Sequence, residues 1–344
     1  MKKLLLIIPF LAVMLACQKD PVPVSEDGSA EITFSIDLPS PQTKASEATV
    51  YSWENTVNSI QYYIFNAEGR LEAYFMTTSP ASVTRSVSIG RKTVWAVVNV
   101  PESRFSGCTS LSDFLSRGVS FADIASYNFP MSGSVSTIIT TGSNTVSVQV
   151  SQLVCRVIFK DISNALDNSL QGEDFSVGNI FLSNVVCNSR IDGSTPSALG
   201  WSSQCGRCSG ATSPDEYVEW EEDVSYPLWT FCDESTDVIW DECYCMGDFF
   251  YFFPNPTVSD TCGWTYPFTP RYTRIVVEIF IRGERYYYPI NLNGAKRNHS
   301  YDLHLTVTRP GSLDPDTFDW AEIQDVNITI GGFDDFDDDL EIIY

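Results

Sequence analysis

Strict alternation of apolar and polar positions predicts a β-strand near the start of the chain. The apolar positions are Ile32, Phe34, Ile36 and Leu38, and the polar positions between them are Glu31, Thr33, Ser35 and Asp37. A period of two sends one set to a core and the other to solvent. Polar segments at 21–29 and 39–46 flank this strand, and the second of them places Lys44 ahead of Ala45. The pattern therefore predicts a core strand that cleavage after Lys44 would separate from the rest of the chain.

The same alternation returns near the other end of the chain, at Val326, Ile328 and Ile330. A chain with one removable strand and one similar strand can assemble by exchanging strands between copies. A second reading is that 326–330 is simply the last strand of its own domain. Leu340, Ile342 and Tyr344 form another short alternating segment, so the sequence leaves open which C-terminal segment is donated.

Between these two segments the chain is dominated by β patterns. Strands are expected at 57–65, 71–76, 82–89, 92–100, 136–140, 145–150, 153–160, 177–186, 274–281, 286–292 and 300–308. The turn-forming run 66–70 joins the first two of these as a hairpin, and Gly90 and Arg91 join the next two. One short helix, ending at Leu115, is expected with Ser112 as its cap. Frequent turns between short strands predict an all-β fold of the sandwich or barrel type.

The β pattern is interrupted once, between residues 188 and 270, where periodicity disappears and Trp, Tyr, Asp, Glu and Cys are frequent. This stretch is interpreted as a long elaborated insert, and insertions of this kind often carry recognition. With the boundary placed near Val150, residues 45–150 form an N-terminal sandwich domain and residues 151–344 a C-terminal one that contains the insert.

The first residues predict export and lipidation. Lys2 and Lys3 precede an apolar run at 4–15 that is too short to span a bilayer. The run ends in Met-Leu-Ala-Cys, which is similar to the bacterial lipobox, so cleavage is expected between Ala16 and Cys17, with lipid attached to Cys17. Residues 1–16 are then a signal peptide, and residues 17–44 a lipid tether with the removable strand. An ordinary secretory signal followed by a cysteine is the alternative.

Charge and composition exclude several functions. The net charge of −23 argues against nucleic acid and anionic membranes as partners and fits an extracellular surface. Only two histidines occur, and the chain contains no nucleophile elbow, phosphate-binding loop or metal-binding histidine pair. We therefore expect no enzymatic activity and no cofactor. The acidic run at 334–339 lacks the spacing of a calcium-binding loop and is interpreted as a solvated segment.

Six cysteines fall in the insert: Cys205, Cys208, Cys232, Cys243, Cys245 and Cys262. Disulfides are the commoner outcome outside the cytoplasm, and six cysteines allow 15 pairings. Free thiols and a four-thiolate zinc site, formed by the two closely spaced cysteine pairs, are the alternatives. Because one of those pairs has irregular spacing for zinc, we expect no metal.

Several local patterns occur in the order found in one known family. They are the lipobox, the strand at 32–38, the basic junction at Lys44, the hairpin IQYYIFNAEGR at 60–70, TVWAVVNVP at 93–101, FPMSG at 129–133, the strand at 154–157 and the late strand at 298–308. Together they resemble the fimbrillins, the major-fimbrial-subunit-like lipoproteins of Bacteroidetes. The resemblance covers most of the chain outside the insert.

This resemblance implies two transthyretin-like β-sandwich domains in tandem and a role as a structural subunit of a cell-surface fimbria. It also implies a lipid-anchored precursor at the outer membrane, removal of the first strand by a trypsin-like protease, and polymerisation by donor-strand exchange with other fimbrial subunits. Family precursors are usually cut after Arg, whereas Lys44 stands at the matching position here. The alternative is a fimbrial tip or anchor lipoprotein, or an adhesin, that keeps its lipid and binds a host or bacterial surface ligand through the insert. A surface glycan-handling protein is a third reading.

Overall fold

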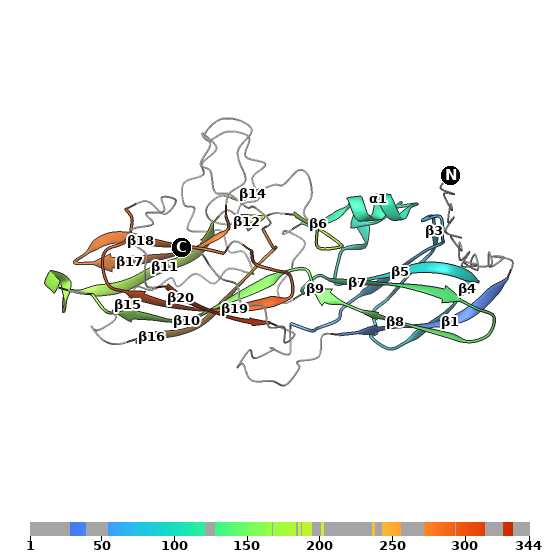
Figure 1. The fold of residues 1–344 in the computed structure, drawn as a ribbon, viewed down its shortest axis with the longest axis horizontal. Helices are drawn as coiled ribbons and strands as arrows, with labels where there is room; N and C mark the ends of the chain where they lie inside the picture. Colours follow the sequence, from blue (N-terminus) through green and yellow to red (C-terminus); the bar gives the residue numbers. More distant parts are fainter. Residues whose placement is uncertain are drawn as a thin grey trace, which may run out of the picture.

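The structure is a computed structural model that describes residues 28–38, 54–120, 128–166, 168–183, 185–186, 188–194, 201–202, 236–237, 243–255, 272–292, 294–313 and 326–332. Within these ranges the chain is nearly all β, with one short α-helix, α1 (Leu111–Ser116), and 3-10 turns at Glu102–Arg104 and Asn168–Leu170. The strands form two lobes that lie end to end (Figure 1). The predicted all-β fold class is confirmed. In the described part of the chain, no helix has the length and apolar character needed to cross a membrane.

The first lobe is a sandwich of two sheets. One sheet has the order β3-β2-β5-β7-β9, with strands β3 (Leu71–Thr77), β2 (Ile60–Phe65), β5 (Gly90–Val98), β7 (Met131–Ile139) and β9 (Ser151–Gln152). The other has the order β4-β1-β8, with strands β4 (Val83–Ser88), β1 (Ser29–Asp37) and β8 (Asn144–Gln149). Their facing sides share one apolar core, to which β2 contributes Ile60, Tyr62 and Ile64.

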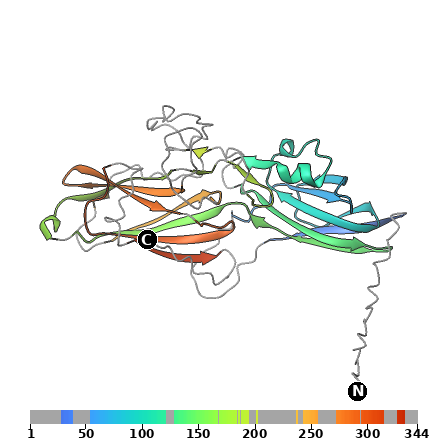
Figure 2. The ribbon, with the colours of Figure 1, turned by 45° about the horizontal axis from the view of Figure 1, so that its top comes forward.

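Strand β2 is buried on both sides, because α1 covers the outer face of its sheet (Figure 2). The helix inserts Phe114 among the alternate residues of β2, with ring centroids 4.8 Å from Tyr63 and 5.5 Å from Phe65. All six residues of this strand are buried, and its five apolar or aromatic residues are therefore explained by two different cores.

The second lobe also contains two sheets, and each of them has four strands. The first has the order β16-β10-β19-β20, with strands β16 (Cys243–Phe252), β10 (Cys155–Asn164), β19 (His299–Val307) and β20 (Val326–Gly332). The second has the order β15-β11-β17-β18, with strands β15 (Thr236–Asp237), β11 (Phe175–Ser183), β17 (Arg274–Ile281) and β18 (Glu284–Asn291). Most pairs are antiparallel, but β1 with β8 and β10 with β19 are parallel.

Two short ladders complete the described strands, and one of them joins the lobes. Strand β12 (Val185–Val186) pairs with β14 (Trp201–Ser202). Strand β13 (Asn188–Arg190) pairs antiparallel with β6 (Gly118–Ser120), which belongs to the first half of the chain. At residue 118 a glycine is needed, because a Cβ there would lie 2.8 Å from the carbonyl oxygen of Ser189.

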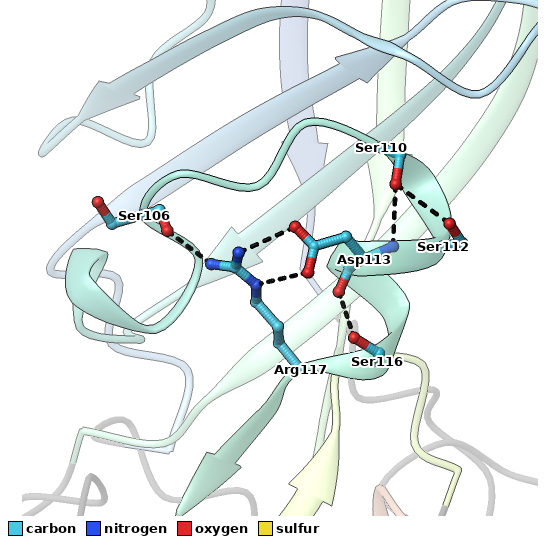
Figure 3. Close-up of polar contacts among 6 residues, drawn as sticks. All are labelled: Ser106, Ser110, Ser112, Asp113, Ser116 and Arg117. Atoms are coloured by element: carbon cyan, nitrogen blue, oxygen red, sulfur yellow. Dashed lines mark hydrogen bonds and ion pairs between the residues drawn. The ribbon is translucent and has the colours of Figure 1, made fainter.

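Three predicted details are wrong. Strands β4 and β5 do not form a hairpin: β4 pairs with β1 and β5 with β2 and β7, so the chain changes sheets at Gly90, whose φ is 117°. The helix cap is Ser110, whose Oγ accepts from the backbone N–H of Asp113 at 3.1 Å, and not Ser112 (Figure 3). The predicted insert is too long, because β16 lies within it and pairs along β10.

The predicted domain boundary near Val150 falls close to the change of sheet. Strand β9 still belongs to the first lobe, where it pairs with β7, and the sheet of the second lobe begins with β10 at Cys155. The intervening Leu153 and Val154 are fully buried in the apolar cluster that continues into the second lobe.

Candidate functional site

The predicted removable strand, β1, is the middle strand of its sheet. It pairs antiparallel with β4, from Ser29 opposite Ser88 to Phe34 opposite Val83. On its other edge it pairs parallel with β8, from Ile32 opposite Asn144 to Asp37 opposite Gln149. Among the strands that the structure describes, β4 and β8 have no other partner in this sheet. Strand β1 therefore holds the sheet together.

The apolar face of β1 fills the centre of the first lobe. Ile32 is 1% exposed and Phe34 is 0% exposed. The Phe34 ring centroid lies 5.6 Å from that of Tyr62 and 5.3 Å from that of Phe75, and these two rings stack on each other at 4.9 Å. Ile36 and Leu38 are half-buried and pack against the same cluster. Two of the four predicted core positions are thus fully enclosed, and two lie at its margin.

The opposite face of β1 makes only exposed polar contacts. The hydroxyl oxygens of Thr33 and Thr84 are 3.2 Å apart, and Ser35 donates to the Ser147 hydroxyl at 3.1 Å. The Ser147 hydroxyl in turn donates to the Asp37 carboxylate at 2.6 Å. Hydrogen bonds in water contribute little net stability because solvent competes for each group. The apolar face and the two ladders are therefore what retain β1.

Outside β1, the structure places the predicted donor segment at a sheet edge. Strand β20 pairs antiparallel with β19, with Val326 opposite Leu305 and Ile330 opposite Tyr301. It is an edge strand of its own lobe, so donating it to another copy requires its release from β19. The choice of donor segment stays a prediction.

The structure describes only some of the remaining predicted site residues. Ala16, Cys17, Lys44 and Ala45 lie outside the described residues, as do Cys205, Cys208, Cys232 and Cys262. Cys243 and Cys245 lie on β16, at the positions opposite Ser163 and Asp161 of β10. Across the ranges that the structure covers, no three His, Cys, Asp or Glu residues gather as metal ligands would. The disulfides stay a prediction.

Two other cysteines, Cys108 and Cys155, are buried as free thiols. Burial in the apolar surroundings raises the pKa of both thiols, most strongly for Cys155. The thiolate is the reactive form of cysteine, so both are structural residues of the core.

Sequence reasoning missed the polar contacts that join the two lobes. Arg156, the second residue of β10 and part of the mostly apolar run 153–159, forms an ion pair with Glu54 at 2.6 Å, and both side chains are 0% exposed. Arg297, just before β19, donates to carbonyl and hydroxyl oxygens of Ser132 and Ser151 in the first lobe. The available signal for Arg156 was a charged residue inside the otherwise apolar run 153–159, because a buried charge needs a partner.

These features define a class: a protein of two β-sandwich lobes whose first strand is inserted between two others. No protein-family model and no curated protein sequence matches the chain. Among solved structures, it is similar to a fimbrilin from Porphyromonas gingivalis W83, with 14% identity and a TM-score of 0.58 over 88% of this chain and 96% of that one.

Two further solved structures share the fold. One is named a putative cell adhesion protein from Bacteroides eggerthii, with 16% identity and a TM-score of 0.58 over 88% of this chain and 96% of that one. The other, under the same name, is from Parabacteroides distasonis, with 13% identity and a TM-score of 0.58 over 88% of this chain and 99% of that one. At these identities the similarity establishes the fimbrilin-like β-sandwich fold.

Proposed function

We propose that this protein is a structural subunit of a cell-surface fimbria that polymerises by donor-strand exchange. The observation that carries the proposal is the position of β1 between β4 and β8, which it alone links among the described strands. Cleavage after Lys44 separates β1 from the rest of the chain. Its departure leaves two unpaired strand edges and uncovers the pocket that Phe34 fills against Tyr62 and Phe75.

The energetics fit a strand that is replaced rather than simply lost. Burying a side chain such as Ile32 or Phe34 contributes roughly 1.5–3 kcal/mol. A whole domain is stable by only about 5–15 kcal/mol, so loss of β1 leaves a marginal lobe. A strand from another subunit restores both ladders and the apolar face, in the manner of β-strand addition.

In this proposal the precursor reaches the outer membrane as a lipoprotein anchored through Cys17, and the mature subunit joins other subunits in an extracellular fimbrium. The strand that enters the vacated place comes from the C-terminal region of a second copy, with Val326, Ile328 and Ile330 as its apolar positions. The proposal requires no catalytic or cofactor site in this chain.

One observation favours a second candidate, a terminal fimbrial subunit that loses its lipid and β1 by cleavage at Lys44 but does not donate a strand. Strand β20 is already paired with β19 in its own lobe, so a copy that never releases β20 accepts a strand without donating one. Such a subunit ends a fimbria rather than extending it.

The test is limited trypsin digestion of the lipid-free precursor, followed by intact mass measurement and a native gel. The K44A variant serves as the control, since it keeps every other tryptic site. We expect loss of the residues up to Lys44 and a ladder of oligomers, neither of which forms with K44A. A ladder should also disappear when a synthetic peptide of residues 326–332 is added in excess before digestion.

The other outcomes separate the candidates. Cleavage at Lys44 without any ladder identifies a terminal subunit. Resistance at Lys44 contradicts the maturation step and leaves an anchored lipoprotein. A ladder that forms equally well with K44A would contradict strand removal as its cause.

A further inference from the structure

A pocket of about 400 Å³ lies at the junction of the two lobes. The first lobe lines it with Trp95 of β5, Ser132 and Ser134 of β7, and Ser151 of β9. Register brings these four together, because Trp95 is opposite Ser134 and Ser132 is opposite Ser151, and directly opposed residues project on the same face. The second half of the chain adds Asp192, Arg297 and His299. We call this the junction pocket.

Arg297 provides a positive charge in the junction pocket, and all of its hydrogen bonds go to neutral oxygens. Its Nε donates to the Gln152 carbonyl at 3.1 Å. Its Nη2 donates to the carbonyl and hydroxyl oxygens of Ser132 and Ser151 at distances between 2.8 and 3.3 Å. No ion pair involves Arg297 among the described residues, and none of these hydrogen bonds uses its Nη1.

Burial of the Arg297 side chain lowers its pKa to about 10, although the charge of Asp192 acts in the opposite direction. The cause is desolvation, which disfavours the charged form of a basic group. A guanidinium held in this way gains most from an anion that brings charge and two acceptor oxygens together, as a carboxylate does.

The other walls suit a ring that carries hydroxyl groups. Trp95 packs against Phe114, with ring centroids 5.5 Å apart, and its small exposed part (8%) borders the pocket as an aromatic contact for an apolar C–H face. Ser134 is an exposed hydroxyl on the same side of the sheet. His299 uses Nδ1 at 2.8 Å from the Arg297 carbonyl, which leaves Nε2 for another partner. A few placed polar groups beside an aromatic wall are typical of a small-molecule site.

We propose that the junction pocket binds a carboxylate-bearing sugar ring of the uronic acid class, with the carboxylate on Nη1 of Arg297. The ring hydroxyls are placed to reach Ser134 and His299. No residue of β1 lines the pocket, so the proposal can be tested on the uncleaved precursor.

The test uses the lipid-free full-length precursor and sodium D-glucuronate as the probe, with binding followed by isothermal calorimetry and by tryptophan fluorescence. D-glucose tests the need for the carboxylate, and sodium acetate tests the need for the ring. We expect saturable binding of glucuronate that is at least about tenfold tighter than that of glucose, because glucose lacks the charge-assisted hydrogen bond. Binding should also be tighter than that of acetate, because acetate lacks the contacts of the ring.

Two variants locate the site. R297Q should weaken glucuronate binding by at least about tenfold. D192N removes a competing negative charge while keeping the side-chain oxygen that accepts from Ser194 N–H at 2.8 Å, so it should tighten binding by about two- to fivefold. A loss of binding in R297Q could result from destabilisation of the junction between the lobes. A gain of affinity in D192N cannot result from misfolding, so this variant keeps the proposal testable.

The proposal would be overturned by the absence of saturable glucuronate binding, by equal affinity for glucose, or by unchanged affinity in both variants. Equal affinity for acetate would also overturn it, and would point to a protein carboxylate as the occupant.

Discussion

Nη1 of Arg156 lies 2.6 Å from Oε1 of Glu54, and this ion pair is completely buried where the two lobes meet. The Tyr251 hydroxyl donates to the same carboxylate oxygen at 2.6 Å. Burial, and then the negative charge of Glu54, raises the pKa of that hydroxyl far above its usual value. Gln152 also donates to the Glu54 carbonyl, at 2.9 Å. Glu54, which precedes β2, thus connects the first lobe to β10 and β16 of the second lobe.

Replacing Glu54 with Gln should leave the Arg156 cation buried without its counter-ion. Because an uncompensated buried charge is costly, we expect the free energy of unfolding to fall by about 3–5 kcal/mol. Urea denaturation followed by tryptophan fluorescence measures this change. The control is E173Q, which removes a 2.7 Å ion pair with Arg282 in which both partners are well exposed, and which should have little effect. Equal losses in the two variants would contradict the role given to the buried pair.

Phe34 is the residue of β1 whose truncation should matter most. The F34A variant removes a fully buried ring that contacts both Tyr62 and Phe75, and it should destabilise the first lobe by about 3–5 kcal/mol. The E31A variant changes an exposed position of the same strand and serves as the matched control. Thermal unfolding of the uncleaved precursor distinguishes them. Similar melting temperatures for the two variants would show that β1 contributes little through its apolar face.

The N-terminal cap of α1 distinguishes Ser110 from Ser112, two residues further along the chain. The S110A variant removes the hydroxyl that accepts from Asp113 N–H, and it should cost about 1 kcal/mol (Figure 3). In contrast, S112A removes a hydroxyl whose described contact is with Ser110, at 3.1 Å, and should cost much less. Urea denaturation of both variants gives the comparison. A larger loss of unfolding free energy in S112A than in S110A would support Ser112 as the cap, as expected from the sequence.

The ion pair between Lys92 and Glu72 should make stability depend on pH. Burial alone would raise the pKa of Glu72, but hydrogen bonds from Lys92 and Ser88 outweigh it and hold that pKa below its usual value. The stabilisation is therefore complete above the unfolded pKa, near 4.3, and disappears as the pH falls through the lower folded value. We expect the stability difference between wild type and E72Q to be largest at neutral pH and to vanish in acid. A difference that stayed constant with pH would contradict this coupling.

The sequence was most informative where one face of a strand meets the core and the other meets water. The alternation from Glu31 to Leu38 predicted β1 correctly, and the turn at 66–70 predicted the hairpin of β2 and β3. Alternation identifies a strand but not its neighbour, which is why β4 and β5 were wrongly paired with each other. Their separation depends on contacts with β1 and β7, which are distant in sequence.

Strand β16 was missed for a different reason. Its residues Phe250, Tyr251 and Phe252 are all buried, so the segment lacks the alternation by which exposed strands are recognised. The junction pocket was also beyond sequence reasoning. Its seven named residues come from five separate stretches of the chain, and their proximity follows from how the lobes pack.

The place that β1 occupies also has a mechanical consequence. A strand with ladders on both edges, antiparallel to β4 and parallel to β8, resists a pull along its own axis with all its backbone hydrogen bonds at once. A pull across the sheet would break the same bonds one after another. Any strand seated there is therefore strongest under tension directed along its length, the load that flowing liquid applies to a thread fixed at one end.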